Sequence, residues 1–218
     1  MDVERSRERM VERQLVRRGI TDERVLEAMR RVPRQLFVAE HERKRAYEDV
    51  PLSIGAGQTI SQPYMVALIA QAAAAGPASK VLDVGTGSGY AAAVFAELGA
   101  DVHTIERIPE LAETARENLR AAGYADVHVH VGDGSLGVPE EAPFDAVAVA
   151  AAAPGFPPAL YEQLVPGGRL VVPVGGPAGQ RLEVAVRSPE GPAVLHSVEC
   201  RFVPLVGEGG FRAGRRGG

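Results

Sequence analysis

The chain has 218 residues and a mass of 23.0 kDa, enough for one domain with a sizeable core. Hydrophobic residues make up 45% and charged residues 24% of it, which excludes intrinsic disorder for the bulk of the chain. The single cysteine, Cys200, excludes an intrachain disulfide and fits a reducing compartment. The formal net charge of −4 creates no global field that would attract nucleic acid.

Residues 1–45 predict helices, because apolar side chains recur at helical spacing among charges of both signs. Thr21 is expected to cap a second helix, which Pro33 ends. Alternating charges are typical of a solvated helix face rather than a nucleic-acid patch. The first residues lack the apolar segment of a signal peptide, and the longest apolar run, 146–153, is too short to span a membrane. We therefore expect a cytoplasmic protein with neither nucleic-acid nor membrane partners.

Residues 46–63 change character, because glycines and prolines punctuate the segment. The pattern predicts a long loop with short extended pieces. Loops of this length within a compact domain are usually functional. The alanine-rich apolar run over 64–75 that follows predicts a buried helix.

From Lys80 onward, short apolar strands alternate with helical segments, a pattern that indicates a largely parallel sheet with helices on both faces. Strands are predicted over 81–84, 101–105, 127–131, 145–149 and 169–174, and helices over 90–98, 109–121 and 158–164. Three further strands, expected over 182–187, 194–198 and 201–206, would extend the sheet edge in antiparallel fashion. The predicted fold class is α/β: a doubly wound, mostly parallel, Rossmann-like sheet with N-terminal helices and antiparallel C-terminal strands.

A glycine-rich turn follows the first of these strands and opens a helix. Its spacing, Gly-x-Gly-x-Gly over Gly85, Gly87 and Gly89, departs from the dinucleotide fingerprint, whose last position is held here by Tyr90. The turn therefore favours a nucleoside without a pyrophosphate over NAD. Asp83, at the end of the strand, would repel a pyrophosphate but attract an ammonium group.

Two more acidic residues follow the next two strands. Glu106 is placed to accept hydrogen bonds from both ribose hydroxyls, and Asp133, between two glycines, to accept the amino proton of adenine. Each alone would be an ordinary surface or turn residue. Because the carboxyl ends of parallel strands meet at one edge, we expect both acids to join Asp83 in a single site.

Together these residues resemble the S-adenosylmethionine site of a class I methyltransferase. Four further segments, which together with this site extend the similarity over about 5–207, resemble the protein-L-isoaspartate O-methyltransferase family: 10–15, 46–49, 57–63 and 201–207. The loop Thr59-Ile60-Ser61-Gln62-Pro63 is the segment specific to that family. Ala56 and Ala150 depart from residues frequent in it.

The resemblance implies methyl transfer from S-adenosyl-L-methionine to the free α-carboxyl group of L-isoaspartyl residues in damaged proteins and peptides, with S-adenosyl-L-homocysteine as product. The methyl ester would then close to a succinimide and start repair. Ser61 is implied as the catalytic residue that orients the substrate carboxylate, with Thr59 and Val206 also beside the substrate. The glycine turn and the resemblance together assign the cofactor to Thr59, Ile60, Asp83, Gly85, Thr86, Gly87, Ser88, Gly89, Glu106, Arg107, Asp133 and Gly134.

The implied organisation is a single methyltransferase domain over 1–207, expected to be a monomer. Within it, 1–63 would hold the N-terminal helices and substrate loop, and 64–207 the cofactor-binding core and C-terminal strands. Residues 208–218, rich in glycine and arginine, are expected to be a disordered tail.

Alternatives remain open at this point. The main one is a methyltransferase of the same fold that acts on another carboxyl acceptor, such as a modified peptide. A non-catalytic nucleoside-binding protein and an RNA-binding Arg/Gly tail are further alternatives. His128 and His130 share one strand face, but without a recognisable third ligand they are expected to be ordinary strand residues, and no metal site is predicted.

Overall fold

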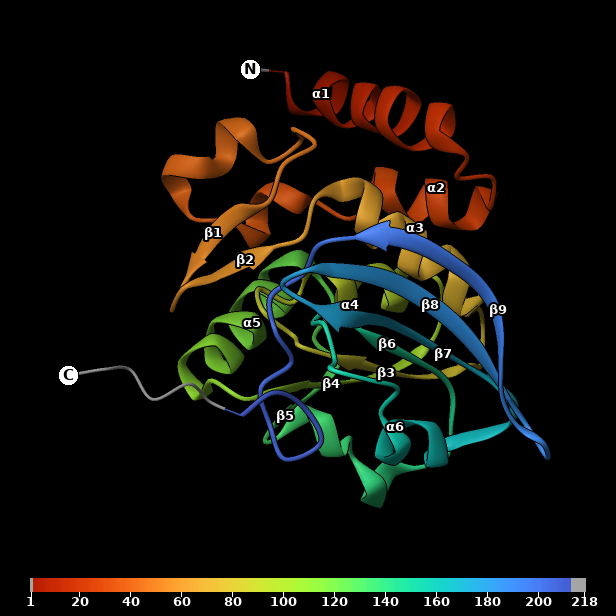
Figure 1. The fold of residues 1–218 in the computed structure, drawn as a ribbon. Coiled ribbons are helices and arrows are strands. Elements are labelled where there is room, and N and C mark those ends of the chain that lie inside the picture. The colour runs from red at the N-terminus through yellow and green to blue at the C-terminus, as the bar shows by residue number, and fades with distance from the viewer. Residues whose placement is uncertain (1, 213–218) are drawn as a thin grey trace.

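The computed structural model describes residues 2–212. A seven-stranded sheet lies between two helical layers, and the N-terminal helices add a further layer on one side (Figure 1). The helices are α1 (Val3–Met10), α2 (Glu23–Arg31), α3 (Pro63–Ala73), α4 (Tyr90–Glu97), α5 (Pro109–Ala122) and α6 (Pro158–Glu162). Helices α3, α4 and α5 cover the face of the sheet beneath α1 and α2, and α6 lies on the opposite face. Within residues 2–212, no helix is long and apolar enough to cross a membrane.

The sheet has the strand order β5-β4-β3-β6-β7-β8-β9. Its strands are β3 (Lys80–Val84), β4 (Asp101–Glu106), β5 (His128–Val131), β6 (Phe144–Val149), β7 (Leu164–Gly176), β8 (Gly179–Ser188) and β9 (Gly191–Cys200). Strands β3 to β7 run parallel, whereas β8 and β9 are antiparallel additions. The predicted fold class is confirmed. The chain passes from β3 to β4 and β5 on one side and then returns to β6 and β7 on the other side of β3. Because the strand order reverses at β3, a crevice is expected at the carboxyl ends of the strands beside it.

Two apolar cores form on the two faces of this sheet, because successive side chains of a strand point to opposite sides. Val81 of β3 belongs to the core under α3 and α4, whereas the adjacent Leu82 belongs to the core that includes Leu160 of α6. Both side chains are fully buried. The alternation fixes which residues of each strand meet which helix layer, and thus how the strand ends are presented.

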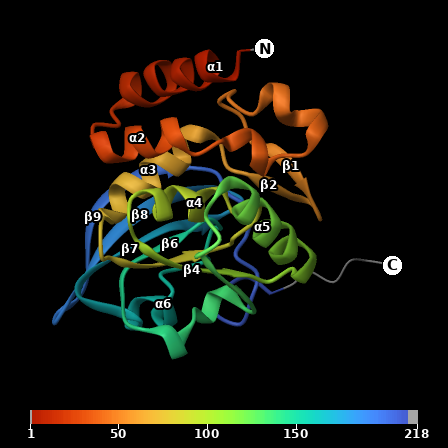
Figure 2. The same cartoon turned by 180° about the vertical axis from the view of Figure 1, so that it is seen from behind.

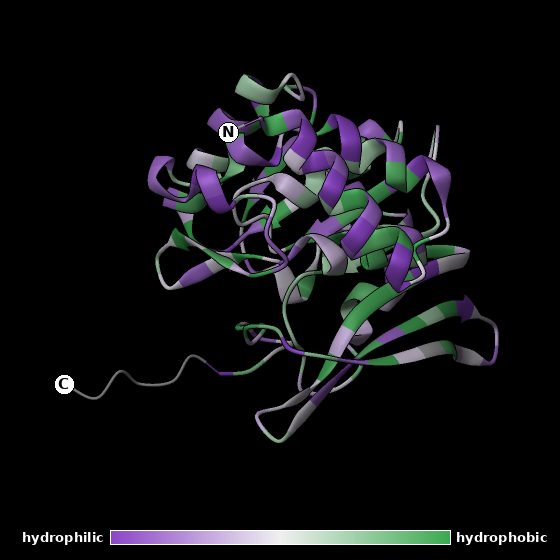
Figure 3. Ribbon diagram, turned by 90° about the horizontal axis from the view of Figure 1, so that it is seen from above, coloured by the Kyte–Doolittle hydropathy of each residue, from purple (hydrophilic) through white to green (hydrophobic). Residues whose placement is uncertain are grey.

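The N-terminal segment packs on the sheet domain through the apolar face of α2. The N-cap of α2 is Asp22, whose side chain accepts a hydrogen bond from the Arg24 amide, so the prediction of Thr21 as the cap is wrong. Instead, the amides of Thr21 and Asp22 both donate to Oε1 of Gln71 in α3, which ties the two helices together. Figure 3 shows hydrophilic stretches alternating with hydrophobic ones along this upper helical layer, as expected for half-buried helices.

The predicted loop over 46–63 contains a two-stranded hairpin, β1 (Leu52–Gly55) and β2 (Gln58–Ile60). Its short extended pieces are thereby confirmed. Seen from either side, the hairpin lies next to α5 (Figures 1 and 2). This position brings the family-specific loop to the carboxyl edge of the sheet.

Residues 201–206 do not form the predicted strand. They pair instead with the connection after β6, where the Ala152 amide donates to the Val203 carbonyl and the Leu205 amide donates to the Ala152 carbonyl, at 2.8 and 2.7 Å. Pro204, between them, has no amide hydrogen with which to continue a ladder. The segment therefore crosses the end of the sheet rather than extending its edge.

The expectation of a disordered tail from residue 208 is wrong for 208–212. The Glu208 amide donates to Oδ2 of Asp133 at 2.7 Å, and the Gly209 amide donates to Oγ of Ser135 at 2.9 Å. The Phe211 amide donates to the Leu205 carbonyl. These backbone hydrogen bonds hold the segment against the end of β5, and the rest of the predicted tail, 213–218, lies outside the described residues.

Candidate active site

A cleft of about 230 Å³ opens at the carboxyl ends of the parallel strands. Most of its lining comes from the β1–β2 hairpin and the loop after it, the glycine turn after β3, the end of β4, and the crossing segment 203–206, and further residues come from the starts of α3 and α4 and the loops after β5 and β6. Most of the predicted site residues meet here, namely Thr59, Ile60, Ser61, Gly85, Thr86, Gly87, Ser88, Glu106, Arg107, Gly134 and Val206. Residues that lie far apart in the sequence are thus brought to one cavity.

The glycine turn takes a backbone shape that needs glycine. Gly85 and Gly87 have φ values of 95° and 54°, in the left-handed region. A Cβ atom on Gly87 would also lie 3.2 Å from Cδ1 of Ile54 in the hairpin. The absence of this side chain lets the substrate-loop hairpin approach the turn and leaves a backbone cradle at the start of α4.

Glu106 is the buried acid of the cleft, only 8% exposed. Its Oε2 accepts the Gly87 amide and its Oε1 accepts the Ile108 amide, both at 3.0 Å. A carboxylate has about four acceptor positions, so each oxygen retains one. Among the described residues, no ion pair involves Glu106. The carboxylate is therefore oriented by backbone donors and keeps capacity for two hydroxyl groups.

Asp83 does not line the cleft, contrary to the expectation of a cofactor contact. It is 2% exposed, and its Oδ2 accepts the hydroxyl of Thr104 at 2.9 Å. Burial raises the pKa of this carboxyl group to about 7, which the Thr104 hydrogen bond opposes. The hydroxyl of Thr86 lies 2.7 Å from that of Thr104. Asp83 thus supports the glycine turn from behind through a chain of hydroxyl groups.

Asp133 and Gly89 also lie outside the lining of the cleft. Oδ1 of Asp133 accepts the amide and hydroxyl of Ser135, and its Oδ2 accepts the Glu208 amide, which leaves one acceptor position on Oδ2. Partial burial acts to raise the pKa of Asp133, but the hydrogen bonds from Ser135 and Glu208 together outweigh it, so the pKa is lowered. At Gly89 a Cβ atom would lie 3.0 Å from Cγ of Leu119, so this glycine allows α4 to pack on α5.

Arg34, which no sequence motif predicts as a site residue, holds the loop that follows β2. Its guanidinium is fully buried and donates to the carbonyls of Ala46 and Ser61, both at 2.7 Å, while Tyr90 stacks below it with its ring centroid 4.7 Å away. Desolvation lowers the pKa of Arg34. No local pattern marks this arginine, because its partners lie 12 and 27 residues further along the chain.

The fold and this cleft define a class I S-adenosylmethionine-dependent methyltransferase: a glycine turn after the first parallel strand and an acid after the second, at a switch point of a doubly wound sheet. Comparison with known proteins narrows this class. The chain belongs to the protein-L-isoaspartate(D-aspartate) O-methyltransferase family, whose model matches residues 5–210.

Individual relatives agree over nearly the whole chain. Protein-L-isoaspartate O-methyltransferase 2 of Marinobacter nauticus is 56% identical over 212 residues, which cover 96% of this chain and 97% of the relative. A solved protein-L-isoaspartate O-methyltransferase superposes with a TM-score of 0.85 at 28% identity, covering 94% of this chain and 67% of the other. A structure assigned to the same family, from Plasmodium falciparum in complex with S-adenosyl-L-homocysteine, has a TM-score of 0.80 at 27% identity and covers 92% of this chain and 98% of its own.

Proposed function

We propose that this chain transfers the methyl group of S-adenosyl-L-methionine to the free α-carboxylate of L-isoaspartyl residues in damaged proteins and peptides. The resulting ester closes to a succinimide, which begins repair. One observation carries this proposal: the family-specific loop 59–61 and the glycine turn 85–88 line the same cleft. Membership of the family and the S-adenosyl-L-homocysteine bound to the Plasmodium falciparum relative support it.

The residues of the cleft fit the nucleoside part of this cofactor. Glu106 retains two acceptor positions for the ribose hydroxyls, and the side-chain-free backbone at Gly85 and Gly87 allows close approach of a ligand. Asp133 lies outside the lining of the cleft, and its one remaining acceptor position is assigned to the amino group of adenine. We assign Thr59, Ile60, Thr86, Ser88, Arg107 and Gly134 to the walls of the cofactor site. When bound, S-adenosyl-L-methionine supplies an electrophilic methyl group on a sulfonium.

The acceptor requires little chemical activation. A carboxylate has a pKa near ~4 and is already ionised at pH 7, so no strong general base is needed. The protein must instead align the carboxylate oxygen with the methyl carbon and strip water from it. We assign the first task to Ser61, whose hydroxyl donates to the substrate carboxylate, with Thr59 and Val206 beside the peptide. Buried Ile60 contributes to the second task.

Arg34 positions this loop rather than touching the substrate. Its hydrogen bond to the Ser61 carbonyl joins the loop backbone to the 3-10 helix η3 (Arg34–Phe37) of the N-terminal layer. A fully buried donor with two carbonyl partners leaves the loop few alternative conformations. The N-terminal segment thereby becomes part of the catalytic unit.

The test is a pair of peptides that differ only in one residue, L-isoaspartate in one and L-aspartate in the other. We expect rapid methyl transfer to the isoaspartyl peptide and little to the aspartyl peptide. Equal rates on both would contradict the proposal, and activity confined to an aspartate in a modified peptide would favour the alternative acceptor. The Glu110→Gln variant, altered at an exposed residue of α5, provides a control for unspecific loss of activity.

We also propose that the enzyme acts as a monomer in the cytoplasm. Its one cysteine, Cys200, offers no intrachain disulfide, which fits a reducing compartment. Sedimentation at micromolar concentration measures the assembly state directly, and a stable dimer would contradict this part of the proposal.

A further inference from the structure

Three histidines and an aspartate gather at the opposite end of β4 and β5 from the cleft. The parallel register pairs His103 of β4 with His128 of β5. Because side chains alternate along a strand, Asp101 shares the face of His103, and His130 shares that of His128. On this face the neighbouring strand β3 carries the buried Leu82. The four polar side chains therefore occupy positions where the core would otherwise continue.

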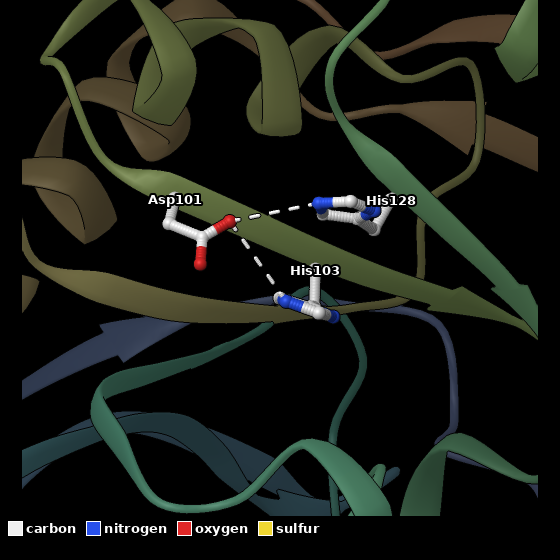
Figure 4. A group of neighbouring side chains, drawn as sticks. All are labelled: Asp101, His103 and His128. Carbon is white, nitrogen blue, oxygen red and sulfur yellow. Dashed lines mark ion pairs between the residues drawn. The ribbon is translucent and has the colours of Figure 1, made fainter.

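Three ligand atoms converge in this cluster (Figure 4). Oδ1 of Asp101 lies 3.8 Å from Nε2 of His103 and 3.8 Å from Nε2 of His128, and all three atoms lie within 4.8 Å of one another. Donor atoms bound to a tetrahedral Zn²⁺ at ~2.0–2.2 Å are about 3.3–3.5 Å apart. Asp101 and His128 have side chains 54% and 57% exposed, so small rotations close the set around an ion.

The buried member, His103, is held in place by its neighbours. Its ring stacks on those of His128 and His130, with centroids 4.6 and 5.3 Å away, and meets Phe144 edge-on. Nδ1 of His103 lies 3.0 Å from Nε2 of His130. With its proton on Nδ1, His103 donates to His130 and presents the lone pair of Nε2 towards Asp101. In proteins, a hydrogen bond donated by the ring nitrogen that does not bind the metal orients a metal-binding histidine.

Two charged residues, Lys80 and Glu141, lie beside the cluster. Oε2 of Glu141 lies 3.8 Å from Nε2 of His103 but pairs with Nζ of Lys80 at 3.2 Å. Lys80 thus compensates the charge of Glu141, which is not counted among the ligands.

We propose that Asp101, His103 and His128 form a binding site for one divalent first-row transition-metal ion, Zn²⁺ foremost, with His130 as the orienting partner of His103. Two imidazole nitrogens and one carboxylate oxygen suit Zn²⁺, whereas Mg²⁺ and Ca²⁺ prefer oxygen ligands. The ion would join β5, the edge strand, to β4. Asp101 begins β4 and Glu106 ends it, so the site is separate from the methyl-transfer chemistry.

The first test is calorimetric titration of the full-length, untagged, chelator-treated protein with ZnCl₂. We expect saturable binding of one ion per chain. Asp101→Asn and His128→Gln, both at exposed side chains, should each weaken binding at least ~10-fold, and His130→Phe should weaken it by ~10- to 100-fold through the lost orienting partner. His41→Gln, at an exposed histidine outside the cluster, should leave the affinity unchanged.

The second test separates the metal class and guards against misfolded variants. Saturating Zn²⁺ should raise the Tm of the wild type but not that of the Asp101→Asn/His128→Gln double variant, and Mg²⁺ should raise neither. The Tm without metal shows whether each variant is folded. The proposal is overturned if the wild type binds no Zn²⁺ saturably, if the double variant binds it equally well, or if Mg²⁺ stabilises the wild type as much as Zn²⁺ does.

Discussion

The two ends of β4 place acidic residues in opposite settings. At the carboxyl end, Glu106 is buried, held by two backbone amides and free of cationic partners among the described residues. At the amino end, Asp101 is exposed and lies beside two imidazoles. The loops that follow parallel strands supply backbone donors at one edge, whereas at the other edge the neighbours are side chains brought together by strand register. One strand thereby carries both the carboxylate that we assign to the nucleoside and the carboxylate that we assign to a metal ion.

The largest effect should come from removing the support beneath the cleft. Arg34→Ala would leave the carbonyls of Ala46 and Ser61 without their buried donor and would open a cavity. We therefore expect the free energy of unfolding to fall by about 3–5 kcal/mol. Urea denaturation measures this change. Arg34→Lys, which keeps the charge but not the fork of donors, should be intermediate in stability and raise the KM for the peptide. Wild-type stability in Arg34→Ala would show that the buried guanidinium is dispensable.

The carboxyl end is probed by Glu106→Gln. The ribose hydroxyls would lose a charged acceptor, so the affinity for S-adenosyl-L-methionine should fall by about 1.5–3 kcal/mol, or ~10- to 150-fold in Kd. Calorimetry measures the Kd directly. The matched control is Glu110→Gln, at the exposed start of α5, which should bind as the wild type does. An unchanged Kd in Glu106→Gln would remove the assigned role.

Asp83, the buried acid behind the cleft, should make the stability of the protein depend on pH. The pKa of Asp83 is raised to about 7 in the folded state from its ordinary value of 3.8, so the folded state binds this proton more tightly than the unfolded chain. Its contribution to stability is full at acidic pH and is lost as the pH rises to about 7, with a slope of at most ~1.4 kcal/mol per pH unit. Denaturation from pH 5 to 8 should show wild type losing stability relative to Asp83→Asn up to about pH 7, and no further. A constant difference across this range would refute the shift.

A smaller effect is expected at the substrate loop. Ser61→Ala should lower kcat by ~2- to 13-fold, because one hydrogen bond to the substrate carboxylate is lost. This corresponds to a rise of about 0.5–1.5 kcal/mol in the activation free energy. The Kd of the cofactor should barely change. Ser53→Ala, at an exposed serine of the same hairpin, is the control. A large loss of cofactor binding in Ser61→Ala would place this serine in the cofactor site instead.

The smallest effect should come from the amino end. His128→Gln alters an exposed side chain far along the sheet from the cleft, so cofactor affinity and turnover should stay within about 0.5 kcal/mol of the wild type. The same cofactor titration and peptide assay measure both. If this variant lost activity as Glu106→Gln is expected to, the two ends of the strands would be coupled and the contrast between them would fail.

Local sequence patterns were sufficient to predict the parallel strands of the sheet and most residues of the cleft. Alternating apolar runs predicted the five parallel strands, and the glycine spacing together with Glu106 predicted a nucleoside site. These features depend on neighbours within a few residues or on the general rule that parallel strand ends meet at one edge. The resemblance carried by 59–63 added the substrate loop, which the structure brings to the same cleft.

Only the tertiary structure decided which groups meet across long stretches of chain. Arg34 reaches Ser61, and Asp133 accepts the Glu208 amide 75 residues away, so residues 208–212 are held in place where their composition predicted disorder. Likewise, His103 and Asp101 join His128 and His130 only because the strand register sets His103 beside His128. Composition and periodicity specify which face a side chain occupies, but the register between strands and the path of a returning segment arise from packing and backbone hydrogen bonding of the whole chain.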